Sequence, residues 1–329
     1  MNGQNLPCQT RLIAADEAGI SAAAALILDG QPVAMPTETV YGLAADATNA
    51  GAVAAIYAAK GRPSFNPLIV HVSGLSMARR FVTVNERALD LAARFWPGPL
   101  TLVLPARAES PIASLVAAGL PSLAVRCPDH PVAQALIAAT GRPLAAPSAN
   151  VSGSISPTRA DHVLQSLNGR IPLVLDGGAT RAGLESTIVA VDGDALHLLR
   201  EGAITAEQLG LEEVVQPSSP DRPTAPGQLL SHYAPRQPLR LNVTAKAAGE
   251  YLIGFGPVKG DYNLSPTGDL AEAASRLFDA LHIAQESGRA SIAAAPVPET
   301  GLGRAINDRL RRAAAPRDQD AASAFNRSA

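Results

Sequence analysis

Cysteine is nearly absent from this sequence, which has only Cys8 and Cys127 among its 329 residues. Two isolated thiols cannot build a disulfide framework or a zinc knuckle. This usage is typical of proteins in a reducing compartment, so we expect a cytoplasmic protein.

Aromatic residues and net charge are also scarce. Phe, Trp and Tyr make up 4% of the chain and the formal net charge is −2, with a pI near 6.3. Few aromatics disfavour the stacking of single-stranded bases, and the charge lacks the basic footprint of a protein whose main role is nucleic-acid binding. A local basic patch is still compatible with these numbers.

Long apolar runs and several common catalytic motifs are missing as well. Ala22–Leu28 is too short to span a bilayer, and the first residues lack the basic and apolar regions of a secretory signal. The sequence contains no G-x-x-x-x-G-K-[S/T], H-E-x-x-H or G-x-S-x-G pattern. We therefore expect no membrane contact, no classical P-loop and no nucleophile that spacing alone identifies.

The residues that are present indicate a globular α/β protein. Hydrophobic residues make up 47% of the chain and charged residues 17%, and its length suggests two domains. Short apolar strands alternate with helical segments, which favours a sheet with some antiparallel pairing. The Pro- and Ser-rich stretch Gln216–Gly227 predicts an extended linker, followed by a smaller α/β domain and a polar tail from Pro316.

The segment Met35–Val72 gathers unusually many kinds of polar group. A cluster of Thr37, Glu38 and Thr39 is expected to lead into a helix, which ends at Lys60-Gly61-Arg62-Pro63 before a strand that delivers His71. Such a set at the ends of elements indicates a site for a charged small molecule. Two readings of its cations stay open, because cations, Gly and Pro in this order form an ordinary helix stop but also suit a phosphate clamp.

Other polar positions have two readings of the same kind. His71 fits either a core histidine or a hydrogen-bond donor to a ligand, and Arg126 fits either a sheet edge or an anion site. Ser122 and Arg126 have an even spacing on one strand, so they point to the same face. The small polar loop 146–157 precedes a helix, where free amides and hydroxyls form either a capped turn or an anion cradle. Tyr233 ends the proline-rich stretch, where packing alone seldom places an aromatic residue.

Eight motifs in their order and separations carry a family resemblance. They are PTETVYGL, KGRPSFNPL, FWPGPLTLVL, AVRCP, APSANVSG, STIV, LREG and SHYAP. Together they resemble the YrdC/YwlC-type L-threonylcarbamoyladenylate synthases in their longer, two-domain form, over nearly all of residues 14–314.

The resemblance implies a fold and a domain plan. The first domain, 10–210, is expected to hold a twisted mixed sheet flanked by helices. A linker or lid over 211–237 is expected to fold over the cavity of this domain. The resemblance then implies a small Rossmann-like domain over 238–315 and a tail over 316–329.

The resemblance also implies an activity. Such enzymes convert L-threonine, bicarbonate and ATP, with Mg²⁺ accompanying the triphosphate, to threonylcarbamoyl-AMP and pyrophosphate. A downstream complex then transfers the threonylcarbamoyl group to tRNA beside the anticodon. The protein ligands of the metal are unknown, and weak RNA binding by the chain itself stays open.

Site residues follow from the resemblance position by position. Lys60 and Arg62 are expected in the catalytic clamp. The threonine positions are Thr39, His71, Arg126, Ala146 and Ser186, and the ATP positions are Arg62, Asn66, Ser122, Ser148, Ser156, Arg200 and Tyr233. Two alternatives are an RNA-binding or ribosome-associated module and a carbamoyltransferase of related fold. The first is disfavoured by the pI and the few aromatics, and the second by the absence of zinc-type cysteine motifs.

Overall fold

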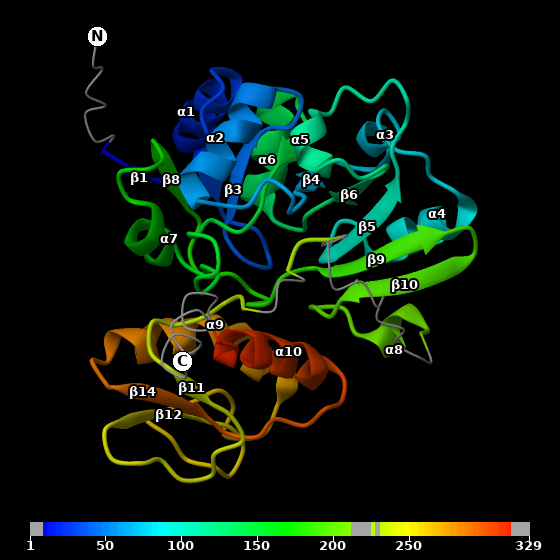
Figure 1. Cartoon of the computed structure of the whole chain (residues 1–329). Helices are drawn as coiled ribbons and strands as arrows, with labels where there is room; N and C mark the ends of the chain where they lie inside the picture. The colour runs from blue at the N-terminus through cyan, green and yellow to red at the C-terminus, as the bar shows by residue number, and fades with distance from the viewer. Residues whose placement is uncertain (1–8, 212–224, 228–230, 317–329) are drawn as a thin grey trace, which may run out of the picture. The chain divides into compact units, whose positions relative to one another are not determined.

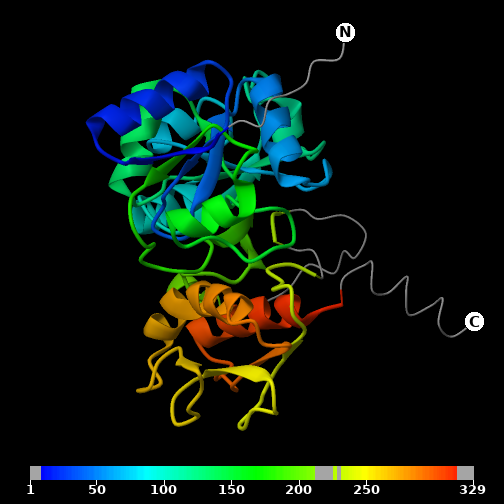
Figure 2. The same cartoon turned by 90° about the vertical axis from the view of Figure 1, so that its left-hand side faces the viewer.

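A computed structural model describes residues 9–211, 225–227 and 231–316 of the protein (Figures 1 and 2). These residues divide into two compact units, one within Met1–Ser152 and Ser156–Gln228 and the other within Gly153–Ile155 and Leu229–Ala329. Most of the expected linker, 211–237, and all but the first residue of the expected tail, 316–329, lie outside the described residues. The proposed domain limits therefore stay a prediction.

The first unit is built on a mixed sheet, which confirms the predicted α/β class. Its strand order is β1-β8-β2-β3-β7-β4-β6-β5-β9-β10, with parallel and antiparallel pairs. The strands are β1 Arg11–Ala14, β2 Val33–Met35, β3 Gly42–Asp46, β4 Ile69–His71, β5 Leu100–Pro105, β6 Ser122–Arg126, β7 Leu144–Ala145, β8 Leu173–Asp176, β9 Thr187–Asp192 and β10 Ala195–Arg200.

Helices lie between these strands and have recognisable ends. Asn49 caps α2 through its side-chain oxygen, and Gly61 ends it with a left-handed φ of 60° that costs glycine little. The expected helix stop is thus confirmed. The helices of this unit are α1 Glu17–Leu28, α2 Ala50–Lys60, α3 Leu75–Ala78, α4 Glu86–Phe95, α5 Ser114–Ala117, α6 Pro131–Thr140, α7 Ala160–Leu167 and α8 Ala206–Leu209.

Side chains of successive strand residues point to opposite faces of the sheet, so each strand feeds two cores. On one face, Val33 and Met35 pack with α1 and α6, which lie side by side in Figures 1 and 2. On the other face, Ala34 joins a larger core with α2, α4, α5 and α7. The sheet is thus covered by helices on both sides.

The second unit is a smaller α/β structure with a parallel sheet in the order β11-β14-β12-β13. Leu277, Phe278 and Leu281 of α9 are buried, and α9 contacts β12. The expected second α/β domain is confirmed at this level. Its elements are β11 Leu239–Arg240, β12 Glu250–Gly254, β13 Tyr262–Asn263, α9 Leu270–Glu286, β14 Ser291–Ala294 and α10 Leu302–Ala314.

Two local predictions were wrong. The Thr37–Thr39 cluster leads into strand β3 rather than directly into a helix, because Gly42–Asp46 pairs with β2 and β7. The spacing Thr158-x-x-Asp161 also predicts a capping box at the start of the next helix, and this box does not form. Helix α7 starts after Arg159 with no side-chain cap, and the Thr158 backbone N–H donates to His162 Nδ1 at 3.3 Å instead.

Candidate active site

The polar site residues share one face of the central strands. His71 follows Ile69 by two residues on β4, and Arg126 follows Ala124 by two on β6. Strands β4 and β6 are parallel, with His71 directly opposite Arg126. Since Ile69 and Ala124 belong to a small cluster separate from the large core, His71 and Arg126 lie on the face that the large core leaves uncovered.

Arg126 is buried, with 3% of its surface exposed, and is held on three sides. Its Nε donates to the Gly98 carbonyl at 3.2 Å, and its Nη1 donates to Thr39 Oγ1 at 2.9 Å. Its Nη2 lies 2.6 Å from Glu38 Oε1. A guanidinium has five N–H donors in one plane, so Arg126 retains donors that can bind a carboxylate in a fixed direction.

His71 stays neutral in this environment. Burial, and then the positive charge of Arg126, lower the pKa of His71 to about 3. Its Nδ1 is buried and has no hydrogen-bond partner among the described residues. A neutral imidazole beside a guanidinium can bind an uncharged group of a ligand without repelling the arginine.

Ser186 and Arg200 form a second polar group on the same side. Arg200 donates through Nε and Nη2 to the Ser186 carbonyl at 3.0 and 2.8 Å. The Ser186 hydroxyl lies 2.7 Å from Thr101 Oγ1 on β5. Gly202 allows this arrangement, because a Cβ there would come within 2.5 Å of the Glu185 carbonyl oxygen.

Lys60 is buried at the end of α2, with 1% of its surface exposed. Its ammonium donates to the Ser148 carbonyl at 2.5 Å and to the Asn150 carbonyl at 2.6 Å. Burial, and then Arg62, lower the pKa of Lys60 well below its usual value. These two bonds tie α2 to the loop after β7, and the expected contact of Lys60 with phosphates stays a prediction.

Arg62 and Asn66 shape the loop that follows α2. Arg62 donates to the carbonyls of Asn66 and Pro67 at 3.2 and 2.8 Å, and Tyr57 donates to the same Asn66 carbonyl at 2.9 Å. The Asn66 side chain is fully buried, yet neither its amide nitrogen nor its amide oxygen has a partner among the described residues. Buried polar atoms without partners are rare and often mark a ligand site.

The remaining predicted positions of this unit surround the same strands. Ala146 is fixed by a backbone bond to Ile69 at 3.0 Å, and Ser148 forms a bridge with Gly42. Ser156 is fully buried and donates to Glu185 Oε1 at 2.6 Å. Ser122 is half-buried at the start of β6, on the Arg126 face as predicted.

Tyr233 belongs to the second unit. Its backbone is left-handed, with a φ of 63°, which is uncommon for a bulky residue. Its ring meets His232 edge-on at 4.0 Å and lies 5.5 Å from Phe278, and the Arg309 guanidinium lies 5.2 Å from the ring centre. Its expected contact with a nucleotide stays a prediction.

Sequence reasoning assigned no role to three polar residues that contact the predicted ones. They are Glu38 beside Arg126, Thr101 beside Ser186 and Glu185 beside Ser156. Glu38 was named in the polar cluster of the first motif, but nothing in the sequence indicated that its partner is Arg126. Thr101 carries no such signal, since it lies within an apolar strand.

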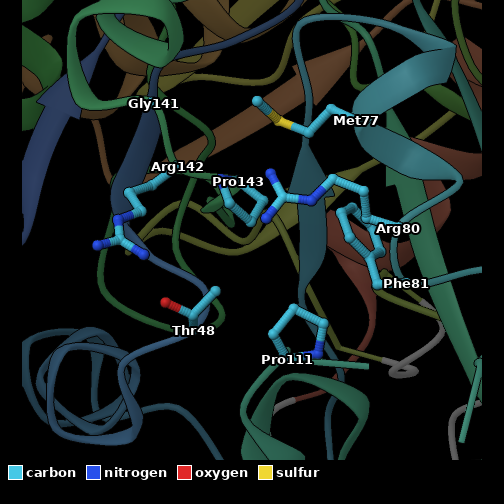
Figure 3. A pocket seen from close by; sticks show the side chains of 8 residues that line it. All are labelled: Thr48, Met77, Arg80, Phe81, Pro111, Gly141, Arg142 and Pro143. Atoms are coloured by element: carbon cyan, nitrogen blue, oxygen red, sulfur yellow. The ribbon is translucent and has the colours of Figure 1, made fainter. Parts of the chain in front are cut away.

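A cavity of about 290 Å³ lies apart from these residues (Figure 3). Arg80 and Arg142 line it with apolar side chains, and none of the predicted site residues contributes to it. The full lining is Thr48, Met77, Arg80, Phe81, Pro111, Gly141, Arg142 and Pro143. Arg142 is about half exposed, and its Nε lies as far as 3.9 Å from Asp46 Oδ2. An exposed and loosely paired ion pair of this kind contributes little to stability.

Within 9–211, 225–227 and 231–316, no group of three or more His, Cys, Asp and Glu side chains could hold a metal ion. Over the same ranges, no helix has both the length and the apolar character that crossing a membrane requires.

Two family models match most of the chain. The Sua5/YciO/YrdC family model, described as telomere recombination, matches residues 25–202. The model of the threonylcarbamoyl-AMP synthase C-terminal domain matches residues 204–315.

Similar whole proteins are also known. The threonylcarbamoyl-AMP synthase of Bacillus subtilis is 42% identical over 91% of this chain and 93% of its own length. That of Pyrococcus abyssi is 39% identical over 91% and 94%. The crystal structure of P. abyssi Sua5 complexed with L-threonine superposes with a TM-score of 0.83 at 36% identity, covering 93% of this chain and 97% of that one. The chain therefore belongs to the two-domain threonylcarbamoyl-AMP synthase family.

Proposed function

We propose that this protein condenses L-threonine, bicarbonate and ATP to threonylcarbamoyl-AMP and pyrophosphate. The observation that carries the proposal is the buried Arg126, fixed beside Thr39 and facing neutral His71 across two parallel strands. A guanidinium with a hydroxyl and an imidazole beside it suits the carboxylate and the hydroxyl of threonine. The related P. abyssi protein has been crystallised with L-threonine.

On the threonine side, each predicted residue has a role in the proposal. Arg126 binds the carboxylate, and the Thr39 hydroxyl fixes the plane of its guanidinium. His71 and Ser186 offer neutral polar atoms, while the Ala146 backbone closes the wall through its bond to Ile69. A site held this firmly restricts the bound amino acid to one orientation.

On the ATP side, Asn66 gives the strongest support, because its buried amide has both a donor and an acceptor without partners among the described residues. Arg62 and Arg200 supply buried cations, with 9% and 8% of their surfaces exposed. Ser122, Ser148 and Ser156 supply hydroxyls, and we keep Tyr233 as a nucleotide contact of the proposal. In the proposal one cluster binds the amino acid and the other binds the triphosphate. Such a pair of neighbouring sites suits a reaction that joins the two substrates.

The chemistry needs no protein nucleophile. The threonine amine combines with bicarbonate to give a carbamate and water. A carbamate oxygen then attacks the α-phosphorus, and pyrophosphate leaves. What the chain contributes is orientation of two anions that would otherwise repel each other, together with fixed positive charge in a site that excludes water.

Magnesium belongs to the proposal as a companion of the triphosphate. We propose that phosphate and water oxygens hold most of its coordination positions, as Mg²⁺ commonly prefers. The ion would offset phosphate charge, while the residues named above position the substrates.

The product defines the next partner in the proposal. A mixed anhydride of a carbamate and AMP is reactive toward amines, so we propose transfer by a tRNA-threonylcarbamoylating complex. Weak RNA binding by this chain would assist that transfer. A cytoplasmic location is part of the same proposal, because ATP, bicarbonate and tRNA meet there.

The test is pyrophosphate release with ATP, magnesium, bicarbonate and threonine, with the nucleotide product identified by mass spectrometry. We expect release only when threonine and bicarbonate are both present. Arg126→Lys should raise the KM for threonine at least tenfold, because a lysine cannot reproduce the planar fork. Arg142→Lys, at the separate cavity, is the matched control. Release that ignores threonine, or tight salt-sensitive RNA binding without release, would disprove the proposal.

A further inference from the structure

Glu38 lies beside the proposed carboxylate site but has no role in the function derived so far. It is 2% exposed, and its Oε1 lies 2.6 Å from Arg126 Nη2. The two groups are close but poorly aligned for a hydrogen bond. Among the described residues, the two Glu38 carboxylate oxygens and Arg126 Nη2 have no hydrogen-bond partner. Glu38 therefore keeps its acceptor capacity for another donor.

The backbone around Glu38 is fixed, so its position is not accidental. Thr37 Oγ1 donates to the Val40 carbonyl at 2.7 Å and accepts from the N–H groups of Thr39 and Val40. The Glu38 carbonyl accepts from the Ala182 N–H at 2.7 Å. A short turn anchored on both sides presents the carboxylate next to the guanidinium.

Charge balance shows what kind of ligand this arrangement suits. Arg126 and Glu38 together have no net charge, and their charged groups are side by side and shielded from water. A simple anion would gain from Arg126 but would be repelled by Glu38. A free α-amino acid carries a carboxylate and an ammonium on one carbon, so it can place one on each partner.

We propose that Glu38 binds the ammonium group of the substrate amino acid and so selects a free α-amino acid over a plain carboxylate. This inference rests on the proposed function, since it assigns a residue to the threonine part of that site. Glu38 then binds the ammonium and Arg126 binds the carboxylate of the zwitterion. The neutral polar groups of the site contact the hydroxyl-bearing side chain.

A simpler role for Glu38 would be to hold Arg126 in place. That role predicts the same loss for every ligand that uses Arg126. Recognition of the ammonium predicts a loss only for ligands that carry one. Comparing L-threonine with (R)-3-hydroxybutyrate, which lacks the amine but keeps the carboxylate and hydroxyl, separates the two roles.

The experiment is calorimetric titration of the full chain with both ligands, in the presence of α,β-methylene-ATP and without bicarbonate. We expect Glu38→Gln to weaken threonine binding by roughly tenfold to a hundredfold, because a charge-assisted hydrogen bond is lost. The affinity for 3-hydroxybutyrate should stay within about twofold or increase, since a repelling charge is removed. Glu109→Gln, at an exposed glutamate, is the matched control.

In steady-state pyrophosphate release, Glu38→Gln should raise the KM for threonine and leave the KM for ATP unchanged. Equal weakening of both ligands, or unchanged threonine affinity, would overturn the inference while leaving the proposed function intact. If wild-type protein neither binds threonine nor releases pyrophosphate, the proposed function itself fails.

A second variant covers the case in which Glu38→Gln does not fold. Glu38→Asp keeps the charge but shortens the side chain by one methylene. We expect weaker binding of threonine with a preference over 3-hydroxybutyrate still present. Loss of that preference in a protein with a normal melting transition would also overturn the inference.

Discussion

Lys60 Nζ donates to the Ser148 carbonyl at 2.5 Å, so a buried ammonium joins the end of α2 to the loop after β7. A second bond reaches the Asn150 carbonyl at 2.6 Å. Sequence reasoning placed Lys60 against the phosphates as a catalytic cation. The contacts add a second consequence, because the ammonium fixes the backbone that carries the Ser148 hydroxyl of the proposed ATP site.

Replacing Lys60 by Met should therefore reduce stability as well as activity. The change leaves the Ser148 and Asn150 carbonyls without their buried donor, and we expect a loss of roughly 2–4 kcal/mol in the free energy of unfolding. Urea unfolding followed by circular dichroism measures this. Lys259→Met, at an exposed position, is the control, and an unchanged midpoint for Lys60→Met would show that the two bonds are dispensable.

Asn66→Ala should weaken ligand binding but, unlike Lys60→Met, should leave stability almost unchanged. The native amide is fully buried without partners among the described residues, so its removal sacrifices no intramolecular hydrogen bond of its side chain. We expect the free energy of unfolding to change by less than about 1 kcal/mol, since the lost desolvation penalty offsets the small cavity.

The same Asn66→Ala variant should raise the KM for ATP about tenfold or more, with the KM for threonine nearly unchanged. Initial rates of pyrophosphate release at varied ATP and at varied threonine give both constants. A variant that lost stability but kept its KM for ATP would show that the amide serves the fold and not the nucleotide.

The order of motifs was sufficient to predict the class of fold and the grouping of several site residues. Ser122 and Arg126 were placed on one face by their even spacing, and β6 confirms that placement. The end of α2 was predicted from Lys60, Gly61 and Pro63, because the left-handed φ of Gly61 is a local requirement.

Contacts between distant segments could not be predicted in this way. The partners of Lys60 lie 88 and 90 residues away. Glu38, in the segment between β2 and β3, meets Arg126 at the end of β6 only in the folded chain. Strand β3 was also missed, since its sequence GLAAD contains few β-branched or aromatic residues. Pairing with β2 and β7 holds it extended, which is a tertiary effect.

Gly202→Ala should disturb the site without touching a polar side chain. An added Cβ would lie 2.5 Å from both the Glu185 carbonyl oxygen and the Thr187 nitrogen, so the backbone must shift. Because Arg200 holds the Ser186 carbonyl beside this turn, we expect weaker binding of both threonine and ATP. Gly193→Ala, where a Cβ meets nothing within 4 Å but the φ is 56°, controls for backbone strain alone. Equal activity of the two variants would contradict the importance of the close approach.

His71 should make stability depend on pH. Its folded pKa is about 3, whereas an unfolded histidine titrates near 6.5. Between these values the unfolded chain binds a proton that the folded chain does not, so stability falls as the pH falls. The full slope is about 1.4 kcal/mol per pH unit, which gives roughly 3 kcal/mol between pH 6.5 and pH 4.

His71→Asn removes this linkage, so the difference in unfolding free energy between wild type and variant should shrink or change sign on acidification. Above about pH 7.5 neither the folded nor the unfolded histidine is charged, and the difference should be constant there, which provides an internal control. Urea titrations from pH 4 to pH 8.5 measure it. A difference that did not vary with pH would mean that His71 titrates alike in both states, and the neutral imidazole assigned to the threonine site would then be wrong.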